Sequence, residues 1–250
     1  MSAEPDPWPE GTARIVLDSV DSTNAEALRH APGPAWVVAG EQTAGRGRRG
    51  RPWASPRGNF YGSLILSPRE APEIVALRSF AAALALHDAC VALTGSPQAF
   101  ALKWPNDVLL NGGKLAGILL ESVGQGRGVA HLVIGIGVNL IAAPDPSQVE
   151  QGALCPVSLL AETGLRITPA RFLDQLAPAY ARWEETLTGR GFAPLREAWL
   201  SRAARLGEPI RARTGTETHE GIFETIDSTG ALVLNQGGQR RAIPAAEVFF

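Results

Sequence analysis

Short apolar runs separated by turn-forming residues predict a β-sheet in the first 205 residues of the chain. Runs of about four to eight apolar and β-branched residues, bounded by Gly, Pro, Asn or Asp, are typical of strands. Such runs are found at 15–20, 36–41, 60–66, 99–103, 108–110, 114–122 and 129–140. The last run is almost continuously apolar, so we expect a strand that is buried on both faces.

Longer segments with helical spacing predict helices between and after these strands. They cover 23–30, 73–94, 156–162, 169–187 and 194–206. Thr23, with Glu26 three positions later, predicts a capping box at the start of the first helix. Segment 73–94 is the longest apolar stretch, and its interruption by charged residues favours a buried helix over a membrane span.

The pattern changes near residue 205, where short strands replace helices. The predicted strands lie at 209–213, 220–226, 231–234 and 241–243. Short strands about 10 residues apart, with turn residues between them, are typical of a small barrel. We therefore expect two domains, 1–204 and 205–250.

Composition narrows the class of protein. Of the 250 residues, 45% are hydrophobic and 19% are charged, which favours a folded globular chain. The net charge of -2 provides no general basic surface for nucleic acid or anionic membrane. Two cysteines, Cys90 and Cys155, are too few for a disulfide framework or a cysteine zinc site. The first eleven residues lack the features of a signal peptide, so we expect a cytoplasmic protein.

A glycine- and arginine-rich segment follows the predicted strand 36–41. Gly45–Gly50 matches the G-x-G-x-x-G pattern, but Pro52 and Pro56 exclude the helix that a dinucleotide-binding turn requires. The segment carries four arginines, Arg46, Arg48, Arg49 and Arg51. Without an anionic partner these would repel one another and stay mobile, and guanidinium groups bind phosphate and carboxylate well. A lid that orders on an anionic ligand and a solvated basic loop both fit this composition.

Lysine is rare, because only Lys103 and Lys114 accompany 21 arginines. Lys103 ends a predicted strand just before Trp104-Pro105, and a strand end holds a side chain rigidly. A compact cation at such a position suits a phosphate or a developing negative charge. Asn106 and Asp107 also suit a turn. The role of Lys114 stays open.

Gly135 and Gly137 alternate along the predicted buried strand, so they leave one face of it without side chains. Glycine weakens a strand unless another group must approach it closely. That group is either a flat ligand or a tightly packed helix, and the sequence does not choose between them.

Five segments, in this order and spacing, resemble the biotin–protein ligase family. They are 21–24, 42–51 with Trp53, 103–107, 114–119 and 135–139. Each segment alone is weak evidence, but the ordered set is highly specific. The resemblance implies an α+β fold, with a mixed β-sheet catalytic domain of the class II aminoacyl-tRNA synthetase/biotin ligase type. A small C-terminal SH3-like β-barrel completes it.

Many bacterial members of this family carry an N-terminal winged-helix DNA-binding domain that represses biotin synthesis genes. Here about 14 residues precede the first predicted strand. The chain thus resembles the short, ligase-only type, and we expect neither a repressor role nor a DNA partner. No membrane partner is expected, and a homodimer is compatible with the resemblance.

The resemblance implies a two-step reaction. Biotin and MgATP give biotinyl-5′-adenylate and pyrophosphate, and a lysine of a biotin carboxyl carrier domain then displaces AMP. Magnesium would come with the nucleotide, and no protein ligand for it is assigned. Lys103 and Arg48 would be catalytic.

The same resemblance assigns two sets of binding residues. The biotin set is Ser22, Thr23, Asn24, Gln42, Gly45, Arg46, Gly47, Arg48, Lys103, Gly117, Gly135 and Gly137. The ATP set is Arg48, Arg51, Trp53, Lys103, Asn106 and Asn139. Hydroxyl and amide side chains in the first set suit the neutral ureido group, which both donates and accepts hydrogen bonds.

Two alternatives remain. A lipoate- or octanoate–protein ligase would share the fold, but it would need a longer apolar tunnel and would lack the arginine-rich segment. A nucleic-acid-binding module would use the arginines on phosphates, but the segment offers only Trp53 for stacking and the net charge is negative.

Overall fold

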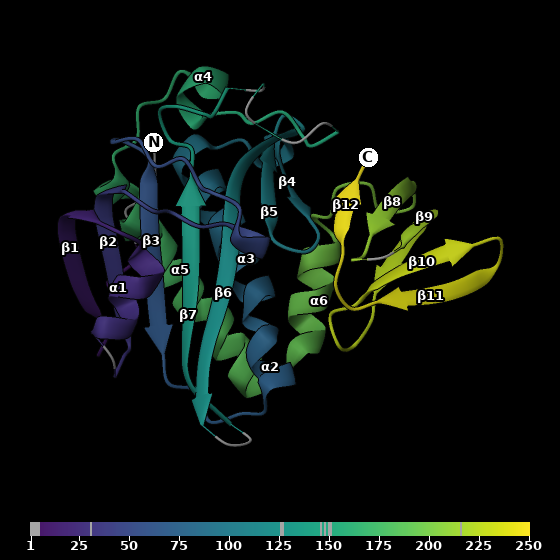
Figure 1. Ribbon diagram of the computed structural model, residues 1–250, viewed down its shortest axis with the longest axis horizontal. Coiled ribbons are helices and arrows are strands. Elements are labelled where there is room, and N and C mark those ends of the chain that lie inside the picture. Colours follow the sequence, from purple (N-terminus) through teal and green to yellow (C-terminus); the bar gives the residue numbers. More distant parts are fainter. Residues whose placement is uncertain are drawn as a thin grey trace.

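A large mixed sheet backed by helices forms most of the molecule, and a small antiparallel sheet follows it (Figure 1). The computed structural model describes residues 6–250 except 31, 126, 127, 146, 148, 150, 151 and 216. This architecture confirms the predicted α+β class.

The large sheet has seven strands in the order β1-β2-β3-β7-β6-β5-β4. Its strands are β1 (Ala13–Val20), β2 (Ala35–Gln42), β3 (Phe60–Leu66), β4 (Phe100–Lys103), β5 (Asp107–Leu110), β6 (Gly113–Gln125) and β7 (Gly128–Val138). Only β1 and β2 pair in parallel. Each strand overlaps a predicted one. The predicted burial holds only for part of β7, which is buried from Leu132 onward apart from half-buried Gly137.

A tight turn at Asn111-Gly112 joins β5 and β6 into a hairpin. Both residues have positive φ, 50° and 82°, as a two-residue turn of this hand requires. The turn brings β6 back along β5, so that Asp107 pairs with Gly117.

Six α-helices lie in the described residues. They are α1 (Thr23–Arg29), α2 (Pro72–Ala76), α3 (Arg78–Thr94), α4 (Leu159–Thr163), α5 (Pro169–Arg190) and α6 (Phe192–Leu200). The predicted helix 73–94 is therefore interrupted, at Leu77. The predicted helix 194–206 ends early, because the chain after it pairs with β4 through Leu102 N to Arg202 O and Ala204 N to Leu102 O, both 2.8 Å.

The capping box predicted at α1 is wrong. Ser22 is the N-cap residue, and its side chain makes no capping hydrogen bond. Glu26 pairs instead with Arg29, and the Thr23 hydroxyl donates to Gln42 Oε1 at 3.1 Å. The polar side chains at this helix start are thus directed into the interior.

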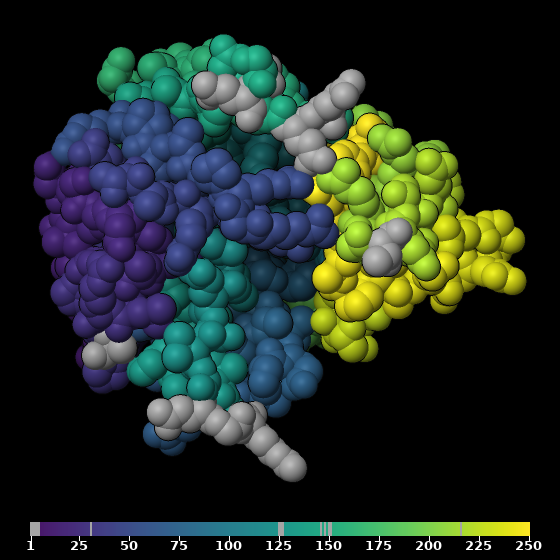
Figure 2. Space-filling model, viewed as in Figure 1, coloured from purple at the N-terminus to yellow at the C-terminus, as the bar shows by residue number. Residues whose placement is uncertain are grey.

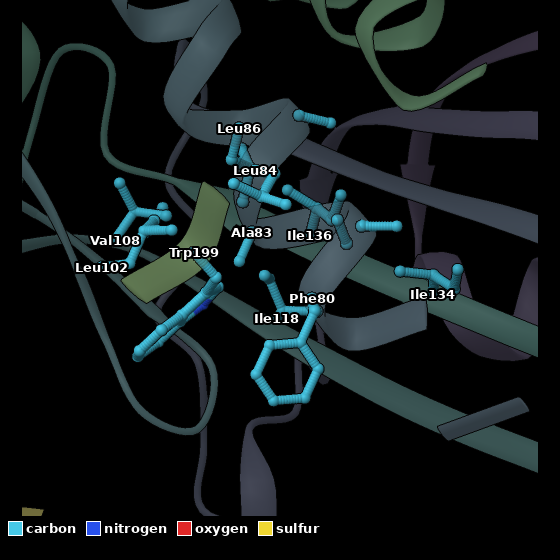
Figure 3. Packing of buried hydrophobic residues seen from close by; sticks show 14 of the residues in the cluster. Phe80, Ala83, Leu84, Leu86, Leu102, Val108, Ile118, Ile134, Ile136 and Trp199 are labelled. Atoms are coloured by element: carbon cyan, nitrogen blue, oxygen red, sulfur yellow. The ribbon is translucent and has the colours of Figure 1, made fainter. Parts of the chain in front are cut away.

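The two faces of the large sheet have different roles. One face packs against α3 and α5, where Ile118, Ile134 and Ile136 belong to the same buried cluster as Phe80 of α3 (Figure 3). The segment Pro72–Thr94 is long and apolar enough to cross a membrane, but 72% of its most apolar window is buried within the protein. The other face presents Ser63, Gly135 and Gly117 toward α1 and the segment after β2, because alternate residues of a strand point to opposite faces.

The C-terminal sheet has the order β11-β10-β9-β8-β12. Its strands are β8 (Pro209–Arg213), β9 (Thr218–Ile226), β10 (Leu232–Gln236), β11 (Gln239–Ile243) and β12 (Glu247–Phe249). The sequence did not predict β12, which has only three residues. Trp104 Nε1 donates to Gly230 O at 3.1 Å, and one apolar core runs through both sheets. The division into 1–204 and 205–250 stays a prediction.

Candidate active site

A cavity of about 850 Å³ lies on the sheet face opposite α3 and α5. Its walls come from α1, the segment after β2, the glycine-bearing parts of β6 and β7, the turn after β4, and β12. All sixteen residues that the sequence assigned to biotin or ATP line this cavity. Its size is in the range of small-molecule sites. The fold thus gathers segments that are far apart in the sequence into one place.

Part of the cavity wall consists of neutral side chains that hydrogen-bond to one another and to their neighbours. Gln42 Oε1 accepts from Thr23 N at 2.9 Å, and Gln42 Nε2 donates to Ser55 Oγ at 3.0 Å. Ser63 Oγ lies 2.6 Å from Asn24 Oδ1 and 2.8 Å from Thr23 Oγ1. Because each amide is held at both ends, this wall presents hydroxyl and amide groups in fixed orientations.

The arginine segment, defined as residues 46–51, crosses the cavity from one carboxylate to another. Arg46 Nη2 lies 3.3 Å from Glu121 on β6, and Arg51 Nη1 lies 2.6 Å from Glu247 on β12. In Figure 2 the blue chain around residue 50 reaches across to the yellow C-terminal unit. Arg49 Nη1 lies 3.4 Å from Glu247 as well.

These contacts supply partners that the sequence did not indicate. Glu121 and Glu247 provide anions for the arginines from within the protein. The partners are separated by 75 positions for Arg46 and 196 positions for Arg51, so no local pattern indicates them. Both carboxylates were missed as site residues.

Glu247 is the centre of the contact with β12. Its carboxylate accepts from Arg51 at 2.6 and 3.1 Å and from Arg213 at 2.8 Å. Partial burial alone would raise the pKa of Glu247, but the hydrogen bonds from Arg51 and Arg213 lower it to about 2. The carboxylate is therefore ionised at neutral pH and holds the segment by charge.

Two lysines flank one carboxylate in the cavity wall. Asp107 Oδ1 is 2.8 Å from Lys114 Nζ, and Asp107 Oδ2 is 3.6 Å from Lys103 Nζ. Lys103 is only 8% exposed and its ammonium lies 5.7 Å from the Phe250 ring, whereas 32% of the Lys114 side chain is exposed. Burial lowers the pKa of Lys103, and Asp107 offsets part of that effect. Lys114, whose role the sequence left open, is thus the more accessible cation.

Arg48 completes this cationic wall. Its Nη1 donates to Asn106 Oδ1 at 3.3 Å, and Asn106 Nδ2 donates to Ile118 O at 2.7 Å. Burial lowers the pKa of Arg48, but a guanidinium group stays charged at neutral pH. Asn139, also buried, donates through Nδ2 to Val157 O at 3.1 Å.

The glycines on β6 and β7 make room for side chains of the site. A Cβ on Gly135 would lie 2.2 Å from Asn24 Oδ1, and one on Gly137 would lie 2.6 Å from the indole of Trp53. A Cβ on Gly117 would also meet that indole, at 3.2 Å. Packing against α3 does not explain these glycines, because α3 covers the other face. The buried Trp53 Nε1 has no hydrogen-bond partner among the described residues, which leaves a donor for a ligand.

The described residues offer little for a protein-held metal. They contain no group of three or more His, Cys, Asp or Glu side chains that could hold one. The cavity carboxylates, Asp107 and Glu247, are both paired with cations.

Comparison with known proteins identifies the class to which this fold and cavity belong. The model of the biotin/lipoate A/B protein ligase family matches residues 16–139, and that of the biotin protein ligase C-terminal domain matches 206–250. The chain belongs to this family. It is 60% identical over 238 residues to the biotin–[acetyl-CoA-carboxylase] ligase of Paracoccus denitrificans, covering 94% of this chain and 99% of that one.

Two further relatives agree with this assignment. The bifunctional ligase/repressor of Bacillus subtilis is 33% identical over 93% of this chain and 71% of its own length. The structure of the Aquifex aeolicus biotin protein ligase in complex with biotin and ATP has a TM-score of 0.79 and 25% identity, covering 94% of this chain and 98% of that one. The resemblance to the biotin–protein ligases is confirmed, and with it the enzyme class.

Proposed function

We propose that this chain is an ATP-dependent biotin–protein ligase that works through the cavity described above. A carboxylate oxygen of biotin attacks the α-phosphorus of ATP, pyrophosphate leaves, and biotinyl-5′-adenylate forms. The amine of a lysine on a biotin carboxyl carrier domain then attacks the acyl carbon, and AMP leaves. The observation that carries this proposal is that a neutral hydrogen-bonding wall and a cationic wall line one cavity.

The neutral wall suits the ureido group of biotin. Thr23, Asn24 and Gln42 present hydroxyl and amide groups whose orientation is fixed by the protein. A ureido group has two N–H donors and one carbonyl acceptor, and these need partners of both kinds. Ser22, Gly45 and Gly47 also line the cavity and belong to the proposed biotin set.

The cationic wall suits the chemical step. The biotin carboxylate and the α-phosphate repel each other, and fixed cations offset that repulsion as charge develops in the transition state. We assign this role to Lys103, Lys114 and Arg48. Lys114 is added to the residues expected from the sequence, because it lines the cavity and its ammonium is positioned by Asp107.

The nucleotide would lie between Trp53 and the amides of Asn106 and Asn139, with Arg51 at the β12 side. The closed arginine segment would exclude water from the adenylate, a mixed anhydride that water hydrolyses. Magnesium is proposed to arrive with the phosphates of ATP, since the described residues form no ligand cluster for it.

The two alternatives fit the cavity less well. The dithiolane ring of lipoate has no N–H or carbonyl group to pair with Thr23, Asn24 and Gln42. A nucleic-acid-binding role would need free arginines, but Arg46 and Arg51 are paired with carboxylates of the protein.

The cell compartment and the domain division are part of the same proposal. We place the protein in the cytoplasm, which the burial of its longest apolar helix supports. The proposed domains are 1–204 for catalysis and 205–250 for the C-terminal barrel, and assembly as a homodimer is compatible with both.

Exchange of labelled pyrophosphate into ATP tests the first half-reaction. The chain with ATP and magnesium should exchange pyrophosphate when biotin is added and show only background with lipoate or octanoate. Exchange that depends on lipoate rather than biotin would contradict the proposal. Binding of single-stranded nucleic acid at about 50 mM salt, with a steep salt dependence, would favour the nucleic-acid alternative.

A further inference from the structure

Glu121 lies just outside the cavity, on the strand that forms its floor. It follows Gly117 and Leu119, which line the cavity, at the next position on the same face of β6. Glu121 itself is not among the cavity-lining residues. Its side chain is 34% exposed and is directed toward α1 and the arginine segment. A carboxylate at this position acts on the cavity through its neighbours.

One neighbour is Asn24, in the neutral wall. Glu121 Oε2 accepts from Asn24 Nδ2 at 2.6 Å, while Asn24 Oδ1 lies 2.6 Å from Ser63 Oγ. An ionised carboxylate can only accept a hydrogen bond, so it selects the nitrogen end of the Asn24 amide. The second N–H of that nitrogen and the remaining lone pair of Oδ1 are left for a ligand. Glu121 thus fixes the orientation of the Asn24 side-chain amide.

The other neighbour is Arg46, at the start of the arginine segment. Arg46 Nη2 lies 3.3 Å from both oxygens of Glu121. Arg46 and Asn24 both line the cavity, so one carboxylate holds a residue of the neutral wall and a residue of the segment that closes over it. A change in the orientation of Asn24 and an opening of the segment therefore act on the same group.

We propose that Glu121 is a positioning residue that links the biotin head-group wall to closure of the arginine segment. The inference rests on the proposed function. With the ureido group bound, a fixed Asn24 keeps Glu121 in the orientation that holds Arg46, and the closed segment retains the adenylate. Removing the charge of Glu121 weakens retention of the adenylate more than it weakens the chemical step.

Two substitutions separate the contacts. Glu121→Gln keeps an acceptor oxygen for Asn24 and loses the charge that holds Arg46. Glu121→Ala loses both contacts. Charge-assisted hydrogen bonds are about twice as strong as neutral ones, so we expect adenylate release to rise by about tenfold in Glu121→Gln. In Glu121→Ala the KM for biotin should also rise by about tenfold.

The measurement is the partition of biotin between two products in single-turnover reactions with biotin, ATP, magnesium and a carrier domain. These products are free biotinyl-adenylate in solution and biotin on the carrier. Asp18→Asn is the matched control. Asp18 pairs at 2.6 Å with Arg57, which lies in the loop between β2 and β3 but outside the arginine segment and the cavity lining. This control should leave the partition unchanged. Thermal unfolding of each variant shows whether it is folded.

A double variant tests whether Glu121 acts through Arg46. If it does, Arg46→Ala with Glu121→Gln releases adenylate no faster than Arg46→Ala alone, because the two effects do not add. Independent, additive effects would overturn the inference, as would a folded Glu121→Gln enzyme with the partition of the wild type. In both cases, biotin-dependent exchange of pyrophosphate into ATP by the wild type would still support the proposed function. Absence of that exchange in the wild type would overturn the proposed function and this inference together.

Discussion

The fold gives individual residues their roles, as is seen for Lys103, Lys114 and Asp107. The sequence indicated Lys103, because a lysine at a strand end before Trp-Pro is held in place. It left Lys114 open, because its contact with Asp107 exists only when the turn at Asn111 folds β6 back along β5. A contact that depends on strand register is not visible in local spacing.

Replacing either lysine by methionine should remove most adenylate formation while the protein stays folded. Loss of one fixed charge stabiliser typically lowers kcat by about 10²–10³-fold. We expect losses of this order for both Lys103→Met and Lys114→Met in biotin-dependent pyrophosphate exchange. The surface variant Arg190→Met serves as a control and should exchange at the wild-type rate. A wild-type rate for Lys114→Met would remove it from the proposed cationic wall.

Gly137 gives a second test. The indole of Trp53 occupies the space that a side chain at position 137 would need. In Gly137→Ala the new Cβ would lie 2.6 Å from Trp53, so the ring must shift away from the strand. We expect a rise in the KM for ATP of about tenfold or more, measured by pyrophosphate exchange, since a misplacement of about 1 Å is costly in a site. Gly189→Ala, where an added Cβ meets nothing within 4 Å, is the control. Equal KM values in the two variants would contradict the position assigned to Trp53.

The arginine segment is the element whose contacts the sequence indicated least. Its composition fitted both a lid that orders on an anionic ligand and a solvated basic loop. In the structure Glu121 and Glu247 supply anions from β6 and β12, so that the segment is held at both ends. The sequence located the element correctly but could not show its partners, which are far away along the chain. β12 was itself missed, and with it the second anchor.

Removing the anchor at β12 should open the segment. Glu247→Gln loses the ion pairs to Arg51 and Arg213, so trypsin should cut between Arg46 and Arg51 several-fold faster than in the wild type. Addition of biotin and ATP should slow cleavage in both proteins. Glu162→Gln, which lies outside the cavity, is the control. Identical cleavage of Glu247→Gln and wild type would show that this carboxylate does not hold the segment.

The same anchor predicts a pH dependence of stability. The pKa of Glu247 is lowered in the folded protein from its ordinary value of 4.5 to about 2. Its contribution is therefore complete above pH of about 4.5 and is lost as pH falls toward 2. The stability difference between wild type and Glu247→Gln, measured by urea unfolding, should shrink across that interval. A difference that grows as the pH falls would contradict the assignment.

At the scale of the whole molecule, the C-terminal unit is packed against the large sheet. Trp104, which directly follows Lys103, donates to Gly230 O, and the rings of Trp199 and Phe223 are 6.5 Å apart. The site thus lies at the junction of the two units, with β12 as one wall. The sequence predicted the seven strands of the large sheet from their apolar runs. It could not predict this junction, because long-range packing decides how the units meet.

This packing predicts that the two units unfold together. The continuous core should give a single transition in urea for the wild type. Trp104→Phe keeps most of the buried ring but loses the hydrogen bond to Gly230, and it should cost about 1 kcal/mol with the transition still single. Two separate transitions in the wild type would instead show that 1–204 and 205–250 are independent units.

Transfer of biotin to its acceptor is the decisive test of the proposed function, because it requires both half-reactions in this one cavity. The chain is incubated with biotin, ATP, magnesium and a purified biotin carboxyl carrier domain, and the acceptor is measured by intact-protein mass spectrometry. We expect the addition of one biotinyl group, on a single lysine, only when biotin and ATP are both present. With Lys114→Met we expect little or no addition. An unmodified acceptor with the wild-type protein, or an acceptor that takes up lipoate in place of biotin, would contradict the proposed function.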